Sequence, residues 1–222
     1  MTSLSLLDMA AESTPIPQRT RDRILDYAEE MFAERGYRGT SLAEIADLVG
    51  IRGPSLFSHF KNKRVLYEAV MERGLDPFFA LLEELAELSD TRARAGTIHA
   101  RLMQHNSAHP RLSRLIQQAV LAGGEQLELL VERWYRPYSE SLTELLSPTT
   151  NASEGDSENV QARRSQSAAM ALNTLILGYF TLAPLHAKLL GIDPLSPDAL
   201  RDHTAILQSL DALLRTQRNE NS

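Results

Sequence analysis

Apolar side chains recur every three or four residues along most of this chain, which is the period of an amphipathic α-helix. The first such stripe consists of Ile24, Leu25, Ala28, Met31 and Phe32. We expect this first helix to begin near Thr20 and to end at Gly36, because glycine readily adopts the left-handed conformation that closes a helix. No segment alternates apolar and polar residues over the length of a strand. The pattern therefore predicts an all-α protein.

Shorter helices follow the first one at once. A second helix is expected in "TSLAEIADLVG", where Ser41 and Glu44 have the spacing of a capping box and Gly50 ends the helix. The next segment, "GPSLFSHF", predicts one or two helical turns and tolerates Pro54 in its first turn. Asn62 then caps a fourth helix, "KRVLYEAVMERGL".

Longer leucine-rich segments occupy the rest of the chain. We expect helices over residues 77–89, 91–108, 110–122, 125–147, 158–190 and 197–217. The predicted fold class is all-α, with an N-terminal three-helix helix-turn-helix domain before a larger helical domain, about nine to ten helices in all. The predicted segments are a flexible arm (1–18), the helix-turn-helix domain (19–66) and the larger helical domain (67–222).

The segment after Gly50 has the features of a DNA-reading helix. Two helices joined by a short turn around a glycine form a helix-turn-helix. Leu56 and Phe60 are expected to point into its core. The opposite face is then small and uncharged, and it consists of Gly53, Pro54, Ser55, Ser58 and His59. Such a face fits a DNA major groove about 12 Å wide.

Charge supports the same interpretation. The chain has 222 residues and a formal net charge of -6, yet no Asp or Glu lies between residues 48 and 67. This interval contains Arg52, Lys61, Lys63 and Arg64, which can contact the phosphates on either side of a groove. Charges act over about 8 to 10 Å in salt, so an acidic remainder does not exclude a nucleic-acid partner. A tight helical hairpin with a solvated basic rim is the alternative that needs no DNA.

Residues 24–66, "ILDYAEEMFAERGYRGTSLAEIADLVGIRGPSLFSHFKNKRVL", resemble the DNA-binding domain of the tetracycline-repressor (TetR) family of bacterial regulators. The segments "FAERGY", "TSLAEIA" and "LFSHFKNK" carry the resemblance. Phe57 stands where the family usually has tyrosine, and Arg52 stands where a short polar cap is common. Because Phe57 has no hydroxyl to give to a phosphate, we expect one fewer contact with the DNA backbone per subunit, for which Arg52 could compensate.

The resemblance also implies roles for single residues. Thr40 or Ser41 would contact a phosphate at the start of the second helix, where free N–H groups favour anions. Ser55, Ser58 and His59 would face the groove and the backbone, and Lys63 would hold another phosphate. The predicted DNA-binding residues are Thr40, Ser41, Arg52, Gly53, Pro54, Ser55, Ser58, His59, Lys61 and Lys63.

Proteins of this family use their remaining helices for a ligand pocket and for dimerisation, and the resemblance implies both here. The candidate pocket residues are Met103, Ile116, Val120, Trp134, Tyr138, Asn173 and Phe180. Core packing alone also accounts for most of these side chains. Asn173 is different, because a lone amide in an apolar stripe needs a partner, either on a ligand or across a dimer.

The last two predicted helices carry apolar stripes that are wider than one neighbouring helix needs, which is typical of a dimer interface. The predicted interface residues are Leu172, Leu175, Ile176, Tyr179, Leu207, Leu210 and Leu214. A dimer would read a pseudo-palindrome with half-sites about 34 Å apart. Residues 165–187 approach the ~20 residues of a membrane span, but Asn173, Pro184 and His186 interrupt them, and we interpret them as an interface helix.

The sequence offers no catalytic or metal chemistry. There is no cysteine, and neither a phosphate loop nor a nucleophile motif occurs. His99, His105 and His109 lack a carboxylate at matching spacing, so we predict no metal site and no cofactor.

We interpret the chain as a cytoplasmic, non-enzymatic homodimer. It is expected to be a ligand-responsive DNA-binding transcriptional regulator, acting as a repressor that a largely apolar small molecule releases from double-stranded operator DNA. The alternatives are a DNA-binding regulator controlled by a protein partner without a small-molecule effector, and a helical enzyme that uses the same scaffold.

Overall fold

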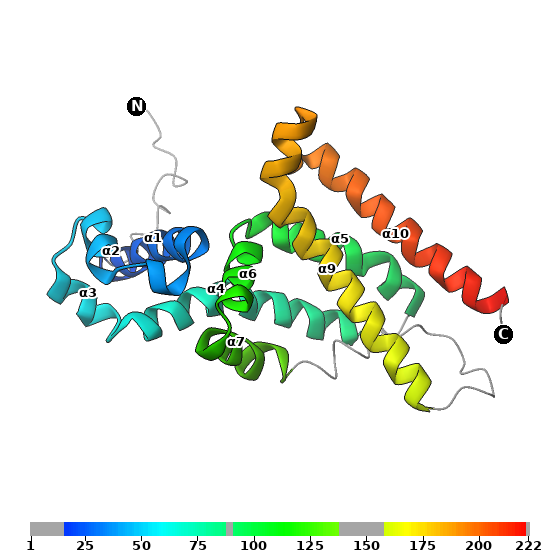
Figure 1. The fold of residues 1–222 in the computed structure, drawn as a ribbon, viewed down its shortest axis with the longest axis horizontal. Helices are drawn as coiled ribbons and strands as arrows, with labels where there is room; N and C mark the ends of the chain where they lie inside the picture. Colours follow the sequence, from blue (N-terminus) through cyan, green and yellow to red (C-terminus); the bar gives the residue numbers. More distant parts are fainter. Residues whose placement is uncertain (1–15, 88–90, 138–157, 221–222) are drawn as a thin grey trace, which may run out of the picture. The chain divides into compact units, whose positions relative to one another are not determined.

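The computed structural model describes residues 16–87, 91–137 and 158–220 (Figure 1). In this part of the chain there are nine α-helices and one π-helical segment, and no strand. The prediction of an all-α fold is therefore confirmed. The chain divides into two compact units between Val70 and Met71, which we describe separately as unit 1 and unit 2.

Unit 1 contains α1 (Ile16–Gly39), α2 (Leu42–Val49), α3 (Gly53–His59) and the first turns of α4 (Lys63–Ala86). Its core is built from the apolar faces of these helices and includes Ile24, Phe32, Ile45, Leu56 and Leu66, all of which are at most 1% exposed. The short amphipathic helices thus pack as a small helical domain of their own.

The start of α1 differs from the sequence prediction, and the predicted end at Gly36 is an interruption within a helix that runs to Gly39. The helix begins at Ile16 rather than near Thr20. Pro17 falls in the first turn, where a missing N–H costs nothing and the fixed φ suits a helix. Gly36 has φ 70° and ψ 175°, which interrupts the helix where the sequence predicted its end.

The predicted capping box at the start of α2 forms only in part. Ser41 Oγ accepts a hydrogen bond from the backbone N–H of Ala43 at 3.2 Å, so Ser41 is the N-cap. The carboxylate of Glu44 pairs instead with Arg35 at 3.3 Å, so the second half of the box was predicted wrongly. The arginine on α1 offers this carboxylate a charged partner that the backbone cannot match.

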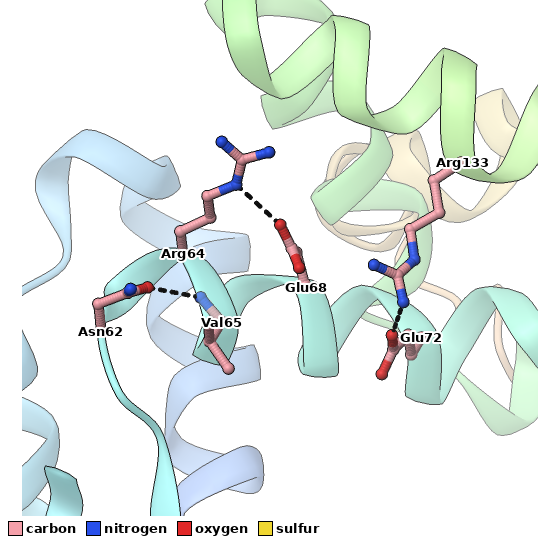
Figure 2. A network of polar contacts seen from close by, with 6 residues as sticks. All are labelled: Asn62, Arg64, Val65, Glu68, Glu72 and Arg133. Atoms are coloured by element: carbon pink, nitrogen blue, oxygen red, sulfur yellow. Dashed lines mark hydrogen bonds and ion pairs between the residues drawn. The ribbon is translucent and has the colours of Figure 1, made fainter.

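The turn between α2 and α3 is fixed by backbone and side-chain hydrogen bonds. Gly50 has φ 73°, and its N–H donates to the carbonyl of Asp47 at 3.0 Å. Arg23 Nη2 on α1 donates to the carbonyl of Val49 at 2.7 Å. Asn62 Oδ1 accepts from the N–H of Val65 at 2.9 Å and caps α4, as predicted (Figure 2). These contacts hold α3 in a defined orientation within unit 1.

Unit 2 contains the remainder of α4, α5 (Thr91–Ala108), α6 (Leu112–Ala122), α7 (Gly124–Leu130), the π-helical segment η2 (Val131–Tyr135), α9 (Glu158–Leu190) and α10 (Pro197–Glu220). In the described residues α9 packs against α5 and α6, and α10 packs against α5. The core of unit 2 lies between these helices.

Two helix boundaries in unit 2 correct the sequence predictions. First, α4 continues through Pro77, where a break was predicted. The missing N–H of proline weakens one turn, but Leu75, Phe79 and Leu82 remain at most 1% exposed on one face and hold both halves of the helix to the core.

The second correction concerns the predicted helix 125–147. It is an α-helix up to Leu130 and then widens into η2, where the N–H of Arg136 donates to the carbonyl of Val131 at 2.7 Å. This hydrogen bond spans five residues and defines the π-helical register. Residues 138–147 lie outside the described residues.

The side chain of Leu112 on α6 lies close to the backbone of α4 at Gly74. A Cβ atom built at this glycine would lie 2.8 Å from Cδ1 of Leu112, which is itself buried. A side chain at this position would therefore require the side chain of Leu112 to move. The carbonyl of Gly74 also lies 3.2 Å from Nε2 of His105 on α5, so three helices meet at this point.

Candidate functional site

The outer face of α3 does not pack against the core of unit 1. Leu56 and Phe60 are 1% and 2% exposed, so they point inward as the sequence predicted. Pro54, Ser55 and Ser58 are exposed, and Gly53 and His59 are half-buried. Ser58 Oγ donates to the carbonyl of Ser55 at 2.7 Å, and a Cβ built at Gly53 meets no atom within 4 Å. The helix thus presents a narrow face that a groove can approach.

Basic side chains flank this face on both sides. Arg52 precedes α3 and Lys61 follows it; both are exposed, and neither has an acidic partner in the described part of the chain. Arg64 differs, because its Nε pairs with Glu68 at 2.8 Å (Figure 2). Of the four cations that the sequence analysis placed here, Arg52 and Lys61 are therefore the more available to an anionic partner.

Lys63, at the first position of α4, is held by an aromatic ring. Its Nζ lies 4.6 Å from the ring centroid of Tyr37, which is a cation–π contact. Burial lowers the pKa of Lys63 from its ordinary value. Tyr37 also contacts Tyr67 edge to face, with ring centroids 5.1 Å apart. The aromatic pair therefore fixes where this ammonium group lies in unit 1.

The two candidates at the start of α2 are placed differently. Thr40 is 3% exposed, and its Oγ1 donates to the carbonyl of Gly36 at 2.9 Å, so its hydroxyl is used within the fold. Ser41 is half-buried at the N-cap, beside the first N–H groups of α2. Of the two, Ser41 is the better placed to meet a phosphate.

A second feature is a cavity of about 190 Å³ inside unit 2. Its described lining comes from α4, α5, α6, η2 and α9. It consists of Leu75, Phe78, Leu82, Leu102, Asn106, Leu112, Ile116, Tyr135, Met170, Leu172, Asn173, Ile176 and Leu177. The polar side chains in this set are Asn106, Tyr135 and Asn173, and none of the set is charged. The cavity can therefore accept a mainly apolar molecule.

The structure brings some of the predicted pocket residues to this cavity and leaves others elsewhere. Ile116 and Asn173 line it. Met103, Trp134 and Phe180 are buried in the core outside its described lining. The two others complete the set: Val120 is 51% exposed on α6, and Tyr138 lies outside the described residues.

Sequence reasoning missed Asn106 and Tyr135. Asn106 follows Leu102 by four residues and therefore falls on the apolar stripe of α5, which is the same signal that singled out Asn173. Tyr135 could not be found in this way, because the π-helical register of η2 changes which side chains face the core.

Some of the predicted interface residues are buried within their own chain, and others are exposed. Leu172, Ile176 and Leu207 are at most 9% exposed and belong to the core of their own chain, the first two at the cavity. Leu175 and Leu210 are 44% and 43% exposed.

Two further predicted interface residues complete the set. Tyr179 is half-buried, and its hydroxyl donates to the carbonyl of Pro194. The side chain of Leu214 lies outside the described ones.

An exposed apolar face runs along α9. It consists of Leu175, Leu182, Leu185 and Leu189, and we call it the α9 leucine face. These side chains recur at helical spacing, and each is more than two fifths exposed. The run Met170–Leu190 is 21 residues long, is 22% buried, and is apolar enough to cross a membrane by length and composition. A helix covered by a second protein surface has the same composition.

Unit 1 is a helix-turn-helix with an acid-free outer edge, and unit 2 is a helical unit with an apolar cavity. Unit 1 therefore has the architecture of a helix-turn-helix DNA-binding domain. The sequence profile described as "Bacterial regulatory proteins, tetR family" matches residues 24–70. Residues 24–70 therefore form a DNA-binding domain of the type found in the TetR family of bacterial regulators.

Curated relatives agree with this assignment. The HTH-type transcriptional repressor KstR2 of Mycolicibacterium smegmatis is 37% identical over 79 residues, which cover 36% of this chain and 38% of the relative. The HTH-type transcriptional repressor ComR of Escherichia coli is 36% identical over 80 residues, which cover 32% of this chain and 38% of ComR. The chain thus matches less than two fifths of the length of either relative. Both are transcriptional regulators and not enzymes.

Solved structures share the fold over most of the chain. The crystal structure of AibR in complex with isovaleryl coenzyme A and operator DNA aligns with a TM-score of 0.61 at 20% identity. The alignment covers 86% of this chain and 97% of AibR. The likeness therefore extends beyond the helix-turn-helix to the helices of unit 2.

Proposed function

We propose that this protein is a dimeric, ligand-responsive repressor. Residues 19–66 form its DNA-binding domain, and residues 67–222 form its effector-binding and dimerisation domain. The observation that carries the proposal is the outer face of α3, which is narrow, uncharged and flanked by the exposed cations Arg52 and Lys61. Exposed cations beside an uncharged face favour contact with the phosphates of a nucleic acid, even on a protein whose net charge is negative.

In the proposed complex α3 enters the major groove. Gly53 and Pro54 allow close approach, and Ser55, Ser58 and His59 meet base edges or the sugar-phosphate backbone. Ser41, Arg52, Lys61 and Lys63 contact phosphates on the two sides of the groove. The hydroxyl of Thr40 is occupied within the fold, so we assign Thr40 the role of holding α2 in place.

The α9 leucine face supports the proposed homodimer. Surfaces of this kind on a regulator are typical of an interface between copies, and α10 adds Ile206 and Leu210, which are 55% and 43% exposed. Two copies of α3 would read the half-sites of a pseudo-palindromic operator about 34 Å apart. The protein would act in the cytoplasm, where that DNA lies.

The cavity supports the proposed control by a small molecule. AibR, which has the same fold, is described with both isovaleryl coenzyme A and operator DNA. In this chain α4 starts in unit 1 and lines the cavity further along. We propose that effector binding favours a spacing of the two α3 helices that does not match the groove repeat. Such coupling typically amounts to about 1 to 3 kcal/mol.

The test is DNA binding by the full chain, measured by fluorescence anisotropy on duplexes from the region upstream of its own gene. We expect a dissociation constant of about 10⁻⁸ M or tighter for one fragment, and far weaker binding to the same bases in scrambled order. Ser58→Glu should abolish binding, because it places a carboxylate against phosphate. Ser167→Glu, at an exposed position on α9, is the matched control. Equal affinity for upstream and scrambled duplexes would overturn the proposal.

A further inference from the structure

The wall of the cavity contains a side-chain amide whose orientation is fixed by the fold. Asn106 on α5 is 2% exposed and lines the cavity. Its Nδ2 donates to the carbonyl of Leu102 at 3.0 Å, which fixes the orientation of the amide. Its Oδ1 accepts no hydrogen bond from any described residue. An amide oxygen in a cavity wall that accepts no hydrogen bond from the protein can accept one from the hydroxyl of a ligand.

A second polar group lies in the same wall. Tyr135 on η2 lines the cavity, and its hydroxyl has no hydrogen-bond partner among the described residues. Burial raises the pKa of Tyr135 to about 12, so the hydroxyl keeps its proton and can both donate and accept. Its ring is held edge to face against Phe79, with centroids 5.7 Å apart. The cavity thus offers one fixed acceptor and one hydroxyl in an otherwise apolar wall.

The charge of the lining restricts the ligand further. No Asp, Glu, Lys or Arg belongs to the described lining. A carboxylate or ammonium group in the cavity would lose its hydration without meeting an opposite charge, which is strongly unfavourable. The part of a ligand that enters this space must therefore be neutral.

The volume sets the size of that ligand. A dry apolar cavity of about 150 Å³ is known to hold one benzene molecule. The cavity here measures about 190 Å³, which leaves room for one ring and a small number of substituent atoms. A bulky headgroup cannot be enclosed together with such a ring.

We propose that the effector is a neutral molecule of about the size of one substituted benzene ring, and that its single hydroxyl donates a hydrogen bond to Oδ1 of Asn106. This inference rests on the proposed function only in treating the cavity as the effector site. The carboxamide of Asn173 on α9 also lines the cavity but is exposed, so solvent competes with a ligand for its hydrogen bonds, whereas Asn106 is 2% exposed. Asn106 is therefore the residue that selects for a donor.

The test uses isothermal titration calorimetry of the full chain with 4-ethylphenol and 4-ethyltoluene, which differ only in a hydroxyl or methyl group. We expect the wild-type protein to bind 4-ethylphenol about tenfold more tightly. Asn106→Ala leaves space for both compounds and should bring the ratio of affinities to about one. Asn173→Ala is the matched control and should keep the tenfold ratio. The charged analogue 4-ethylbenzoate should bind more weakly than either.

Each contrary result has a definite meaning. A wild-type ratio near one, tighter binding of 4-ethylbenzoate, or no binding of 4-ethylphenol overturns the ligand class without any variant having to fold. A ratio that survives Asn106→Ala and is lost in Asn173→Ala overturns the assignment of the acceptor. Adding 4-ethylphenol to the protein–DNA complex separates the two proposals. If the phenol binds and the DNA is not released, the repression mechanism fails and the ligand class stands.

Discussion

Trp134 Nε1 donates a hydrogen bond to Oδ1 of Asp76 at 2.9 Å and so joins η2 to α4. The preceding residue, Arg133, pairs with Glu72 one turn earlier on α4 (Figure 2). Tyr135, the next residue, lines the cavity. Three consecutive residues of η2 therefore connect the cavity wall to a helix that starts in unit 1. We expect the proposed coupling between effector and DNA to depend on this segment.

We expect Asp76→Ala to lower the free energy of unfolding by about 1 to 3 kcal/mol, because it leaves the buried indole N–H without an acceptor. Asp76→Asn keeps an acceptor and should cost less. Glu83→Ala, an exposed acid further along α4, should stay within about 0.5 kcal/mol of the wild type. Urea denaturation measures all three, and equal losses for Asp76→Ala and Glu83→Ala would show that the hydrogen bond contributes nothing.

The basic edge of unit 1 predicts a specific salt effect. Lys61→Ala and Lys63→Ala should each weaken binding to all DNA sequences alike and should each reduce the slope of log K against log salt by about 0.9. Lys188→Ala, on exposed α9, should leave the slope unchanged. Anisotropy titrations between low and physiological salt give the slope. Unchanged slopes in both of the first two variants would contradict the docking of this edge on phosphate.

The α9 leucine face predicts the oligomeric state. Leu182→Lys together with Leu189→Lys should convert the dimer to a folded monomer with native helix content, since both side chains are exposed within the chain. Leu121→Lys is the control, because Leu121 is 82% exposed at the end of α6.

Sedimentation and circular dichroism measure the two properties. A wild-type protein that is monomeric in buffer but binds neutral lipid vesicles through α9 would instead assign this face to a membrane.

Stability should also depend on pH through His105. Burial first, and then the neighbouring His109, lower the pKa of His105 from its ordinary value. The unfolded chain therefore binds this proton at a higher pH than the folded one, and stability must fall as the pH drops through about 6.5. The pKa of His203 on α10 is also lowered, by burial first and then by the neighbouring His186.

The measurement is the free energy of unfolding between pH 7.5 and 5.5. His105→Gln should make this dependence shallower, because one of the two groups no longer titrates. A steeper dependence in the variant would contradict the direction assigned to His105.

The helix-turn-helix could be predicted from sequence because its determinants are local. Ser41 caps α2, Gly50 has the positive φ of the turn, and Leu56 fills the core ten residues after Ala46. Each of these depends on neighbours within a few turns of the same chain segment. The family resemblance rests on the same residues, and both predictions were confirmed.

The cavity could be predicted only in outline. Its wall combines side chains from five elements, and the distinction between a lining and a packed leucine depends on how those elements meet. Leu172 and Ile176 show the difficulty, since the periodicity that assigned them to an interface also fits the inner face of α9. The widened turn of η2, which brings Tyr135 to the cavity, has no sequence signal that we recognise.

The α9 leucine face has a consequence for how sharply a gene would be controlled. If only paired copies occupy an operator, then at low abundance the fraction of operators occupied rises with the square of the number of molecules in the cell. Halving synthesis would then free far more than half of the bound sites. The apolar surface of one helix would in this way set how steeply transcription responds to the amount of the protein.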